Sequence, residues 1–268
     1  MPTPDQKILK IREEAKKLKQ MYLDDPRQNS FNLLLCGETG TGKSHLATTC
    51  PAPVHMDVFD PGGVKHLMPE VISGRIIPAI YEGDDPFKPS MFSQWEKDMK
   101  RRITDGYFDS IATYFLDSST TWANTIMNEI LKRAGMAGEA PRFTHDYIPQ
   151  KTKIVNWMKV LLNLPCNTIV TGHLESSKDE VTGAITYRYM TTGKAEITIP
   201  LEFDEVWVAD TKKTSKGVDY RLVTARTGSY LATTRIGRSK FETYEKPDIT
   251  YLLKKAGRPH ADKELLTA

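Results

Sequence analysis

Short apolar runs and longer amphipathic stretches alternate along the first two thirds of the chain. The apolar runs are residues 31–36, 53–59, 75–80, 111–117 and 167–173. Each run is short and nearly continuous, which favours buried strands of a parallel sheet. Pro78 would restrict one of these strands to a sheet edge or a bulge. The stretches with apolar residues at helical spacing are 90–103, 121–135 and 151–164. This alternation predicts an α/β fold with a mainly parallel sheet.

The last third of the chain has more strand-like segments. The predicted strands are residues 202–210, 219–225 and 229–235. They indicate an antiparallel extension of the sheet. Residues 174–196 are polar and predict a mobile hairpin, and a short helix is expected at 247–257 between a proline and a glycine. The expected core therefore spans residues 30–257, and residues 258–268 are expected to form a flexible tail.

The N-terminal segment has the pattern of an amphipathic helix. Over residues 5–22 apolar side chains recur at spacings of three and four, at Ile8, Ile11, Ala15, Leu18 and Tyr22. A polar break at residues 24–30 indicates a linker, so residues 1–29 are expected to form a helix and a linker outside the core. Two placements of the apolar stripe remain open: against its own domain, or on a neighbouring copy of the chain.

Composition excludes several classes of protein. The 268 residues include 37 Lys+Arg and 34 Asp+Glu, a formal net charge of +3, and 39% of them are hydrophobic, as in ordinary globular proteins. No apolar run approaches the length of a transmembrane helix, and the N-terminus lacks the apolar centre of a secretory signal. The three cysteines have no CxxC spacing, so we expect no disulfide framework or zinc site, and a cytoplasmic location.

The charge is unevenly distributed. Residues 211–268 have 13 Lys+Arg and 6 Asp+Glu, a net charge of +7, which leaves −4 on the first 210 residues. A basic region is typical of nucleic-acid or phosphate-binding surfaces, but also of ordinary solvated surfaces. Residues 142–153 and 174–196 interleave aromatic and basic residues. That mixture suits stacking and phosphate contact on a single strand, although amphipathic hairpins also have it.

The strongest motif directly follows the first predicted strand. GETGTGKS, the phosphate loop at residues 37–44, fits the pattern G-x-x-x-x-G-K-S in full. Its glycines allow several backbone N–H groups to point into one concavity and bind phosphate oxygens. Lys43 is expected to contact the β- and γ-phosphates, and Ser44 a Mg²⁺ ion. The residues expected to bind the nucleotide are Gly37, Glu38, Thr39, Gly40, Thr41, Gly42, Lys43, Ser44 and His45.

Polar residues at the ends of later strands are candidates for the rest of a site. Asp117 is expected to bind Mg²⁺ through a water, beside Ser44. Hydrolysis also needs a carboxylate that positions a water and takes its proton. Asp60, at a strand-to-turn boundary, is preferred to Asp57 for this role, although Asp60 could instead only shape its turn. His173 is expected to contact the γ-phosphate; the alternative is a structural histidine.

A late basic cluster offers a cation for the transferred phosphoryl group. The candidates are Arg235, Arg238 and Lys240, with Arg226 less favoured. A neighbouring copy often supplies such a cation in trans. A solvated strand edge would have the same composition.

The motifs, taken in order, resemble those of the phage-encoded RecA-like P-loop ATPases of the AAA_24 family, which include Sak-type single-strand-annealing proteins. The resemblance is carried by GETGTGKS, MDVFDPGG, YFLDSST, IVTGH, DEVWVAD, TTRIGRSKF and PDITYLLKKAG. It implies a RecA-like core that binds ATP and Mg²⁺ and forms a homo-oligomer. It also implies work on single-stranded DNA, with a single-strand-binding or annealing protein as partner, in the cytoplasm of the host cell.

Residue by residue, the resemblance assigns catalytic roles to Lys43, Asp60, Asp117, His173 and Arg235. The family usually has Glu where this chain has Asp60, and the shorter side chain implies slow hydrolysis. Two other functions remain open. The first is an ATP-gated assembly or accessory protein, in packaging or replication, with little turnover. The second, less favoured, is a small-molecule kinase, because Arg188 is the single arginine that residues 174–196 offer for a lid.

Overall fold

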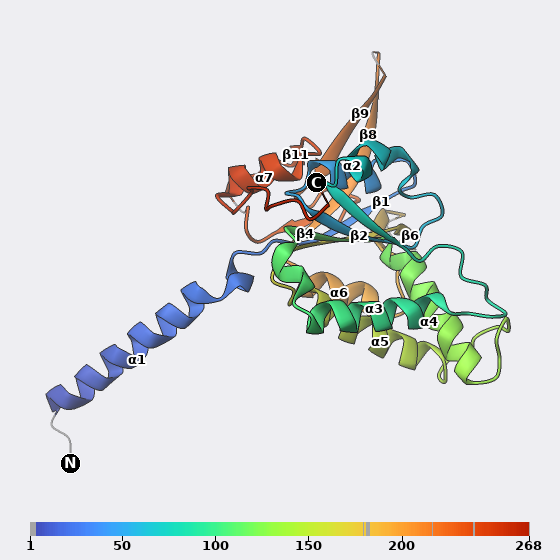
Figure 1. The fold of residues 1–268 in the computed structure, drawn as a ribbon. Helices are drawn as coiled ribbons and strands as arrows, with labels where there is room; N and C mark the ends of the chain where they lie inside the picture. The colour runs from blue at the N-terminus through green and yellow to red at the C-terminus, as the bar shows by residue number, and fades with distance from the viewer. Residues whose placement is uncertain (1–3, 179, 181–182, 216, 238, 268) are drawn as a thin grey trace.

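The structure is a computed structural model, and it describes residues 4–178, 180, 183–215, 217–237 and 239–267. A nine-stranded sheet forms its centre, in the order β11-β9-β8-β1-β5-β4-β2-β3, with β10 paired to β8 outside this path (Figure 1). Its strands are β1 (Asn32–Gly37), β2 (Val54–Val58), β3 (Ile76–Ile80), β4 (Thr113–Asp117), β5 (Asn167–Gly172), β8 (Glu205–Thr214), β9 (Gly217–Val223), β10 (Thr233–Thr234) and β11 (Tyr244–Glu245).

The predicted α/β fold is confirmed. Neighbouring strands are parallel from β8 through β1, β5, β4 and β2 to β3, whereas β9, β10 and β11 pair in antiparallel fashion on the β8 side. The strand that contains Pro78 lies at the edge, as expected. Strands β6 (Leu174–Lys178) and β7 (Ile185–Tyr189) form a separate antiparallel hairpin.

Helices cover both faces of the sheet. The helices of the lower face in Figure 1 are α3 (Met91–Thr104), α4 (Ser119–Arg133), α5 (Tyr147–Leu161) and α6 (Ala195–Glu202). The upper face has α2 (Met68–Ile72) and α7 (Ile249–Ala256). The 3-10 helices η2 (Ser44–Thr49) and η3 (Lys65–Leu67) pack into the same cluster as α7. On β1, Leu34 packs into the lower hydrophobic cluster, whereas Leu33 and Leu35 pack into the upper one. Successive side chains of a strand point to opposite faces, so a strand between two helix layers is apolar throughout.

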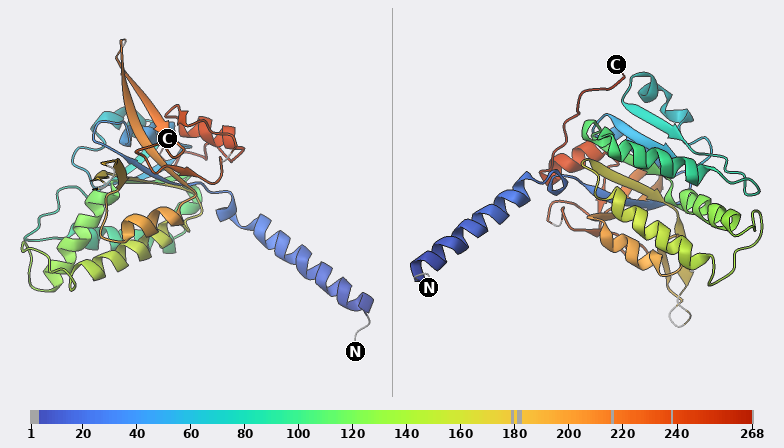
Figure 2. Two further views of the ribbon diagram at one scale, coloured as in Figure 1. Left: turned by 180° about the vertical axis from the view of Figure 1, so that it is seen from behind. Right: turned by 60° about the horizontal axis from the view of Figure 1, so that its bottom comes forward.

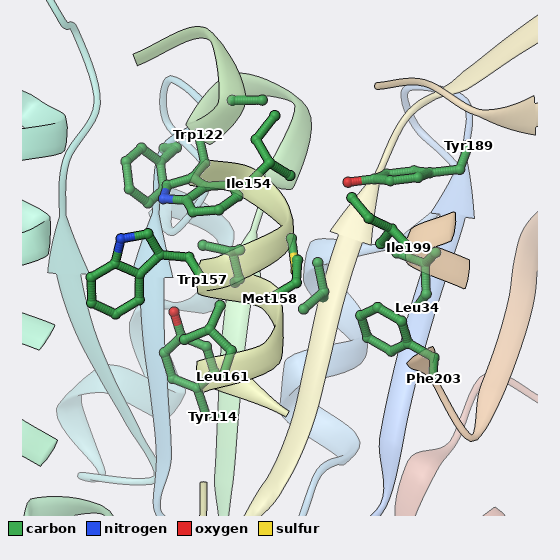
Figure 3. Packing of buried hydrophobic residues seen from close by; sticks show 14 of the residues in the cluster. Leu34, Tyr114, Trp122, Ile154, Trp157, Met158, Leu161, Tyr189, Ile199 and Phe203 are labelled. Carbon is green, nitrogen blue, oxygen red and sulfur yellow. The ribbon is translucent and has the colours of Figure 1, made fainter. Parts of the chain in front are cut away.

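Three tryptophans fix the lower helices to one another. The rings of Trp95 and Trp157 have centroids 4.8 Å apart, and those of Trp95 and Trp122 are 5.3 Å apart. Figure 3 shows Trp122 and Trp157 with part of the lower hydrophobic cluster. Helix α4 begins at Ser119, two residues before the predicted start, because the Ser118 side chain accepts a hydrogen bond from the Thr121 N–H and caps it.

Helix α1 (Pro4–Asp24) projects away from the rest of the domain (Figures 1 and 2). Residues 5–24 of this helix are all exposed to solvent. The placement of the apolar stripe against its own domain was therefore wrong. The base of the helix is held by the 3-10 helix η1 (Pro26–Gln28), where Arg27 donates to Asn163 Oδ1 at 3.1 Å.

The described part of the segment expected as a flexible tail, residues 258–267, has no helix or strand, but several of its side chains contact the domain. Lys263 Nζ donates to the main-chain oxygens of Asp109 and Ile111 at 2.8 and 2.7 Å. Asp262 accepts hydrogen bonds of 2.7 Å from Ala52 N–H and from Arg75. The tail thus lies beside the amino ends of β2 and β4, near the 3-10 helix η4 (Tyr107–Ser110). Within the described ranges, none of the helices has both the length and the apolar character that crossing a membrane requires.

Candidate nucleotide-binding site

The carboxyl ends of β1, β2, β4 and β5 meet at one edge of the sheet, beside a pocket of about 930 Å³. We call it the nucleotide pocket. Its lining is Thr39, Gly40, Thr41, Gly42, Lys43, Ser44, His45, Leu46, Thr49, Asp60, Pro61, His66, Thr121, His173, Tyr220 and Pro247. Crevices at this edge are where ligands bind in open α/β sheets. Most of the residues predicted from the sequence to bind nucleotide line this pocket.

The phosphate loop is curled, and its glycines explain the curl. Gly40 and Gly42 have φ of 82° and 85°, a region that side chains disfavour. A Cβ at Gly37 would lie 2.9 Å from the main-chain oxygen of Ala209, so the neighbouring strand β8 requires glycine there. The short 3-10 helix η2 follows the loop directly. Backbone N–H groups of the loop, rather than a long helix dipole, therefore provide the anion site.

Lys43 lies inside the curl with little exposure. Its Nζ donates to the main-chain oxygens of Gly37 and Glu38 at 2.9 and 2.8 Å. Burial lowers the pKa of Lys43, while the nearby carboxylates of Asp117 and Asp60 partly oppose that shift. Phosphate oxygens bound in the loop would offer this ammonium charged partners, which form stronger hydrogen bonds than carbonyls do.

Asp117 ends β4 and is fully buried. Its Oδ1 accepts a 2.6 Å hydrogen bond from the Thr171 hydroxyl, and Oδ2 is without a hydrogen-bond partner among the described residues. Burial raises the pKa of Asp117, although the hydroxyls of Ser44 and Thr171 lower it in part. A buried, unpartnered carboxylate oxygen beside a serine hydroxyl fits Mg²⁺, which keeps several waters and needs only one or two protein carboxylates. No cluster of three or more His, Cys, Asp or Glu side chains suited to a metal occurs in the described part of the chain, so a denser metal site is not indicated there.

Asp60 faces the nucleotide pocket beside His173. Its Oδ1 accepts a 2.8 Å hydrogen bond from Ser118 and a short one from Thr121, and its Oδ2 lies 3.7 Å from His173 Nε2. Burial alone would raise the pKa of Asp60, but His173 and the two hydroxyls outweigh that effect and lower it. The structure thus brings together Asp60, His173 and the phosphate loop, as the sequence predicted.

Asp57 was the alternative to Asp60 as the carboxylate that positions the attacking water. Its position in the structure does not suit that role. Asp57 is fully buried and lies outside the nucleotide pocket. It accepts hydrogen bonds from Trp95 Nε1 at 2.7 Å and Tyr114 OH at 2.8 Å, and His55 Nε2 lies 3.0 Å away. A carboxylate held this way among side chains of the lower face cannot reach a water at the phosphates.

The late basic cluster lies away from the pocket of its own chain. The Arg235 N–H donates to Asp204 O, and its guanidinium donates to Leu201 O at 2.7 Å. These residues are near the start of β8, and β8 runs parallel to β1, so they lie at the edge opposite the phosphate loop. Lys240 donates to Ala256 O at 2.6 Å, at the end of α7. Arg238 lies outside the described residues.

The sequence reasoning missed several residues in and around the nucleotide pocket. Ser118 and Thr121 contact Asp60, and the run of four hydroxyl residues after Asp117 was the signal that could have indicated them. Tyr220, on β9, places its ring 3.3 Å from where a Cβ of Gly42 would be. No local sequence pattern predicts this position of Tyr220, because the pairing of β9 with β8 brings its ring to the phosphate loop.

A curled glycine loop after the first strand, a buried acid two strands away and a polar residue on the strand between them define a P-loop NTPase. The match to protein-family models agrees: residues 30–236 match the family AAA_24, described as an AAA domain. The chain belongs to this family.

Two solved structures have a distantly similar fold. One is a KaiC-like protein from the hyperthermophilic archaeon Pyrococcus horikoshii OT3, with 12% identity over 71% of this chain and 76% of that chain, and a TM-score of 0.41. The other is the flagellar accessory protein FlaH from Methanocaldococcus jannaschii, with 11% identity over 83% of this chain and 88% of that chain, and a TM-score of 0.42. No curated protein matches the chain.

Proposed function

We propose that the protein is a RecA-like, Mg²⁺-dependent ATPase that binds single-stranded DNA in phage-type recombination or annealing. The observation that carries the proposal is that two sites adjoin at the start of α4. Thr121 lines the nucleotide pocket, and its neighbour Thr120 lines a second groove. A ligand in the groove and a nucleotide in the pocket would therefore contact the same helical turn.

The chain's own residues suit ATP hydrolysis. The loop amides and Lys43 bind the triphosphate, and His173 contacts its γ-phosphate end. Asp60 orients the attacking water through Oδ2 and accepts its proton. Ser44 and Asp117 would hold Mg²⁺, which neutralises charge on the phosphates when it is bound. Because the pKa of Asp60 is lowered, the carboxylate stays ionised at neutral pH but is a weak base, which favours slow turnover.

The second groove, of about 710 Å³, combines aromatic and basic side chains, and we call it the aromatic groove. Its lining is Thr120, Ala123, Asn124, Phe143, Thr144, Tyr147, Ile148, Gln150, Lys151, Glu175, Met190, Thr191, Thr192, Gly193, Lys194 and Glu196. Phe143 is 87% exposed, and its ring centroid lies 6.5 Å from that of Tyr147. Exposed aromatic rings stack on bases, and Lys151 and Lys194 can contact phosphates. Glu175 and Glu196 reduce the charge of the groove, so we expect stacking to supply most of the affinity.

The test is ATP hydrolysis and DNA binding, each measured with and without single-stranded DNA at low and high salt. Phe143→Ala should weaken DNA binding by about 5- to 150-fold, because base stacking contributes about 1–3 kcal/mol per base. Phe87→Ala is the matched control, since Phe87 is also exposed, at 71%, and lies outside the groove. Absence of both DNA binding and stimulation of hydrolysis at low salt would refute the proposal.

Asp60→Ala separates the two steps at the nucleotide. It should remove hydrolysis and leave ATP binding in place, because the phosphate loop is untouched. Unchanged hydrolysis in this variant would assign the base elsewhere.

A second candidate, an ATP-gated assembly protein with little turnover, is favoured by the exposed apolar stripe of α1. Arg235 could reach a nucleotide only in a neighbouring copy, so both candidates include a homo-oligomer. Size measurements with and without ATP distinguish them: nucleotide-dependent oligomers with near-zero hydrolysis, indifferent to DNA, would favour assembly. For the DNA-dependent ATPase, a single-strand-binding or annealing protein is the proposed partner.

A further inference from the structure

The first turn of α4 and its cap form an unbroken run of hydroxyl side chains, Ser118, Ser119, Thr120 and Thr121, which we call the hydroxyl turn. Side chains three positions apart on a helix lie on one face. Ser118 and Thr121 accordingly face Asp60, and Thr121 also lines the nucleotide pocket, whereas Ser119 and Thr120 face β5 and the β6–β7 hairpin. The hydroxyl turn thus lies between the two sites of the molecule.

On the pocket side, the turn holds one oxygen of one carboxylate. Ser118 and Thr121 both donate to Asp60 Oδ1. The other oxygen, Oδ2, points toward His173 Nε2, 3.7 Å away, and Asp60 and His173 both line the pocket. The two hydroxyls therefore decide which oxygen of Asp60 faces a bound nucleotide.

On the other side, the turn is joined to the end of β5 and to the hairpin. Ser119 donates to Thr171 O at 2.7 Å and accepts a 2.8 Å hydrogen bond from Tyr189 OH, both in the interior. Thr120 Oγ1 accepts a 3.1 Å hydrogen bond from the His173 N–H. The Tyr189 ring lies against Gly172, where a Cβ would be 2.5 Å from it, so the ring and strand β5 are closely packed.

The hairpin continues directly into the aromatic groove. Met190, the residue after Tyr189, lines the groove, and its N–H donates to His173 O at 2.9 Å. His173 therefore contacts the turn through its N–H, the groove segment through its carbonyl, and Asp60 through its ring. A movement of Asp60 that displaces the His173 ring would therefore strain the hydrogen bonds of the His173 main chain to Thr120 and Met190, which are 3.1 and 2.9 Å long.

We propose that the hydroxyl turn is a positioning element that orients Asp60 and transmits the state of the nucleotide pocket to the aromatic groove through Thr120 and Tyr189. The identity of the groove's ligand rests on the proposed function. The coupling itself concerns only this chain and its nucleotide, so it can be measured without DNA.

Amide hydrogen exchange of residues 185–196 tests the coupling. AMP-PNP, an unhydrolysable ATP analogue, with Mg²⁺ at saturating concentration should slow exchange there in the wild-type protein. In the double variant Thr120→Val, Tyr189→Phe, the nucleotide-induced change should shrink about tenfold, the size expected for the loss of buried hydrogen bonds. Thr120→Ser with Tyr189 intact should restore it, because serine keeps the acceptor.

Thr125→Val is the matched control. Thr125 is a buried threonine of the same helix whose hydroxyl donates to Trp122 O and contacts neither site. It should retain the wild-type response. A wild-type protein that binds AMP-PNP without any change at 185–196, or a double variant that keeps the full change, would overturn the coupling.

DNA binding measured in the same samples separates the two proposals. The coupling is supported if AMP-PNP changes hydrogen exchange at residues 185–196 and the double variant loses this change. If no DNA binds in the same samples, only the DNA proposal fails. For the positioning role, Thr121→Val should lower kcat for ATP about tenfold at unchanged KM, and Thr121→Ser should restore it. Equal kcat in Thr121→Val and the wild type would overturn that role.

Discussion

Replacing Asp117 with asparagine should stabilise the nucleotide-free protein, although it removes the proposed metal ligand. The carboxylate is fully buried, and its Oδ2 is without a hydrogen-bond partner among the described residues. Burial raises the pKa of Asp117 above its unfolded value. A raised carboxyl pKa means that the folded state binds the proton more tightly than the unfolded state does. The stability that goes with the protonated carboxyl is therefore lost as pH rises through the folded pKa. An asparagine side chain at this position would be neutral at every pH and would keep an acceptor for Thr171.

The magnitude follows from the loss of the buried charge, because the asparagine Nδ2 would take the unpartnered position of Oδ2 as a neutral group. An unsatisfied buried polar group costs about 1–3 kcal/mol, and a charged one costs more. Asp117→Asn should therefore add at least about 1 kcal/mol to the free energy of unfolding, which corresponds to a Tm higher by about 2–4 °C. With Mg²⁺ and AMP-PNP at a hundred times Kd, the wild type gains about 2.7 kcal/mol, whereas the variant gains much less. The order of the two Tm values should then reverse.

Differential scanning calorimetry at pH 7, with and without Mg²⁺ and AMP-PNP, measures both effects. Asp57→Asn is the control, because Asp57 is equally buried but accepts hydrogen bonds from Trp95 and Tyr114. Burial would raise the pKa of Asp57, but His55 and Arg102 outweigh it and the pKa is lowered. That variant should lose about 3–5 kcal/mol, as when one partner of a buried charged group is removed. An Asp117→Asn protein that is less stable without ligand, or that retains the full wild-type response to Mg²⁺, would refute the reasoning.

Three further outcomes follow from the site. Lys43→Ala should abolish ATP binding or turnover, measured by calorimetric titration and phosphate release; wild-type turnover would mean that the phosphate loop is not the active site. Tyr220→Ala should raise KM for ATP several-fold with kcat nearly unchanged, and Tyr220→Phe should behave as wild type, because the ring lies against Gly42 at the pocket; a fall in kcat alone would contradict this. The lowered pKa values of Asp57 and Asp60 stabilise the fold above their unfolded pKa of about 4, and this stability is lost as pH falls through the folded values. Urea unfolding from pH 6 to pH 3 should show that decline, and a flat profile would count against it.

The parts of the site that the sequence predicts are those that one segment determines. The phosphate loop is contiguous, so its glycines and Lys43 could be recognised without knowing the fold. Asp117 and His173 end apolar runs, and parallel strands place their carboxyl ends at a common edge. The structure accordingly places both residues at that edge, beside the phosphate loop.

The contacts that the sequence could not predict depend on topology. Arg235 lies at the far edge because β8 runs parallel to β1, a pairing that its own residues do not specify. Asp57 lies in an apolar run and Asp60 directly follows that run. Only the contacts of Asp57 with Trp95 and Tyr114 show that Asp57 points into the lower core. Tail residues such as Lys263 find carbonyl acceptors at strand ends far away in sequence. Composition identified the tail as polar but could not reveal those acceptors.

The central claim is that the phosphate loop holds the triphosphate of ATP while Ser44 and Asp117 hold its metal ion. A crystal structure with Mg²⁺ and AMP-PNP tests this most directly. The account predicts phosphate oxygens on the amides of residues 39–45, Lys43 Nζ moved from the carbonyls of Gly37 and Glu38 onto the phosphates, and the metal beside Ser44. A nucleotide bound elsewhere, with the loop empty and Lys43 still on those carbonyls, would contradict it.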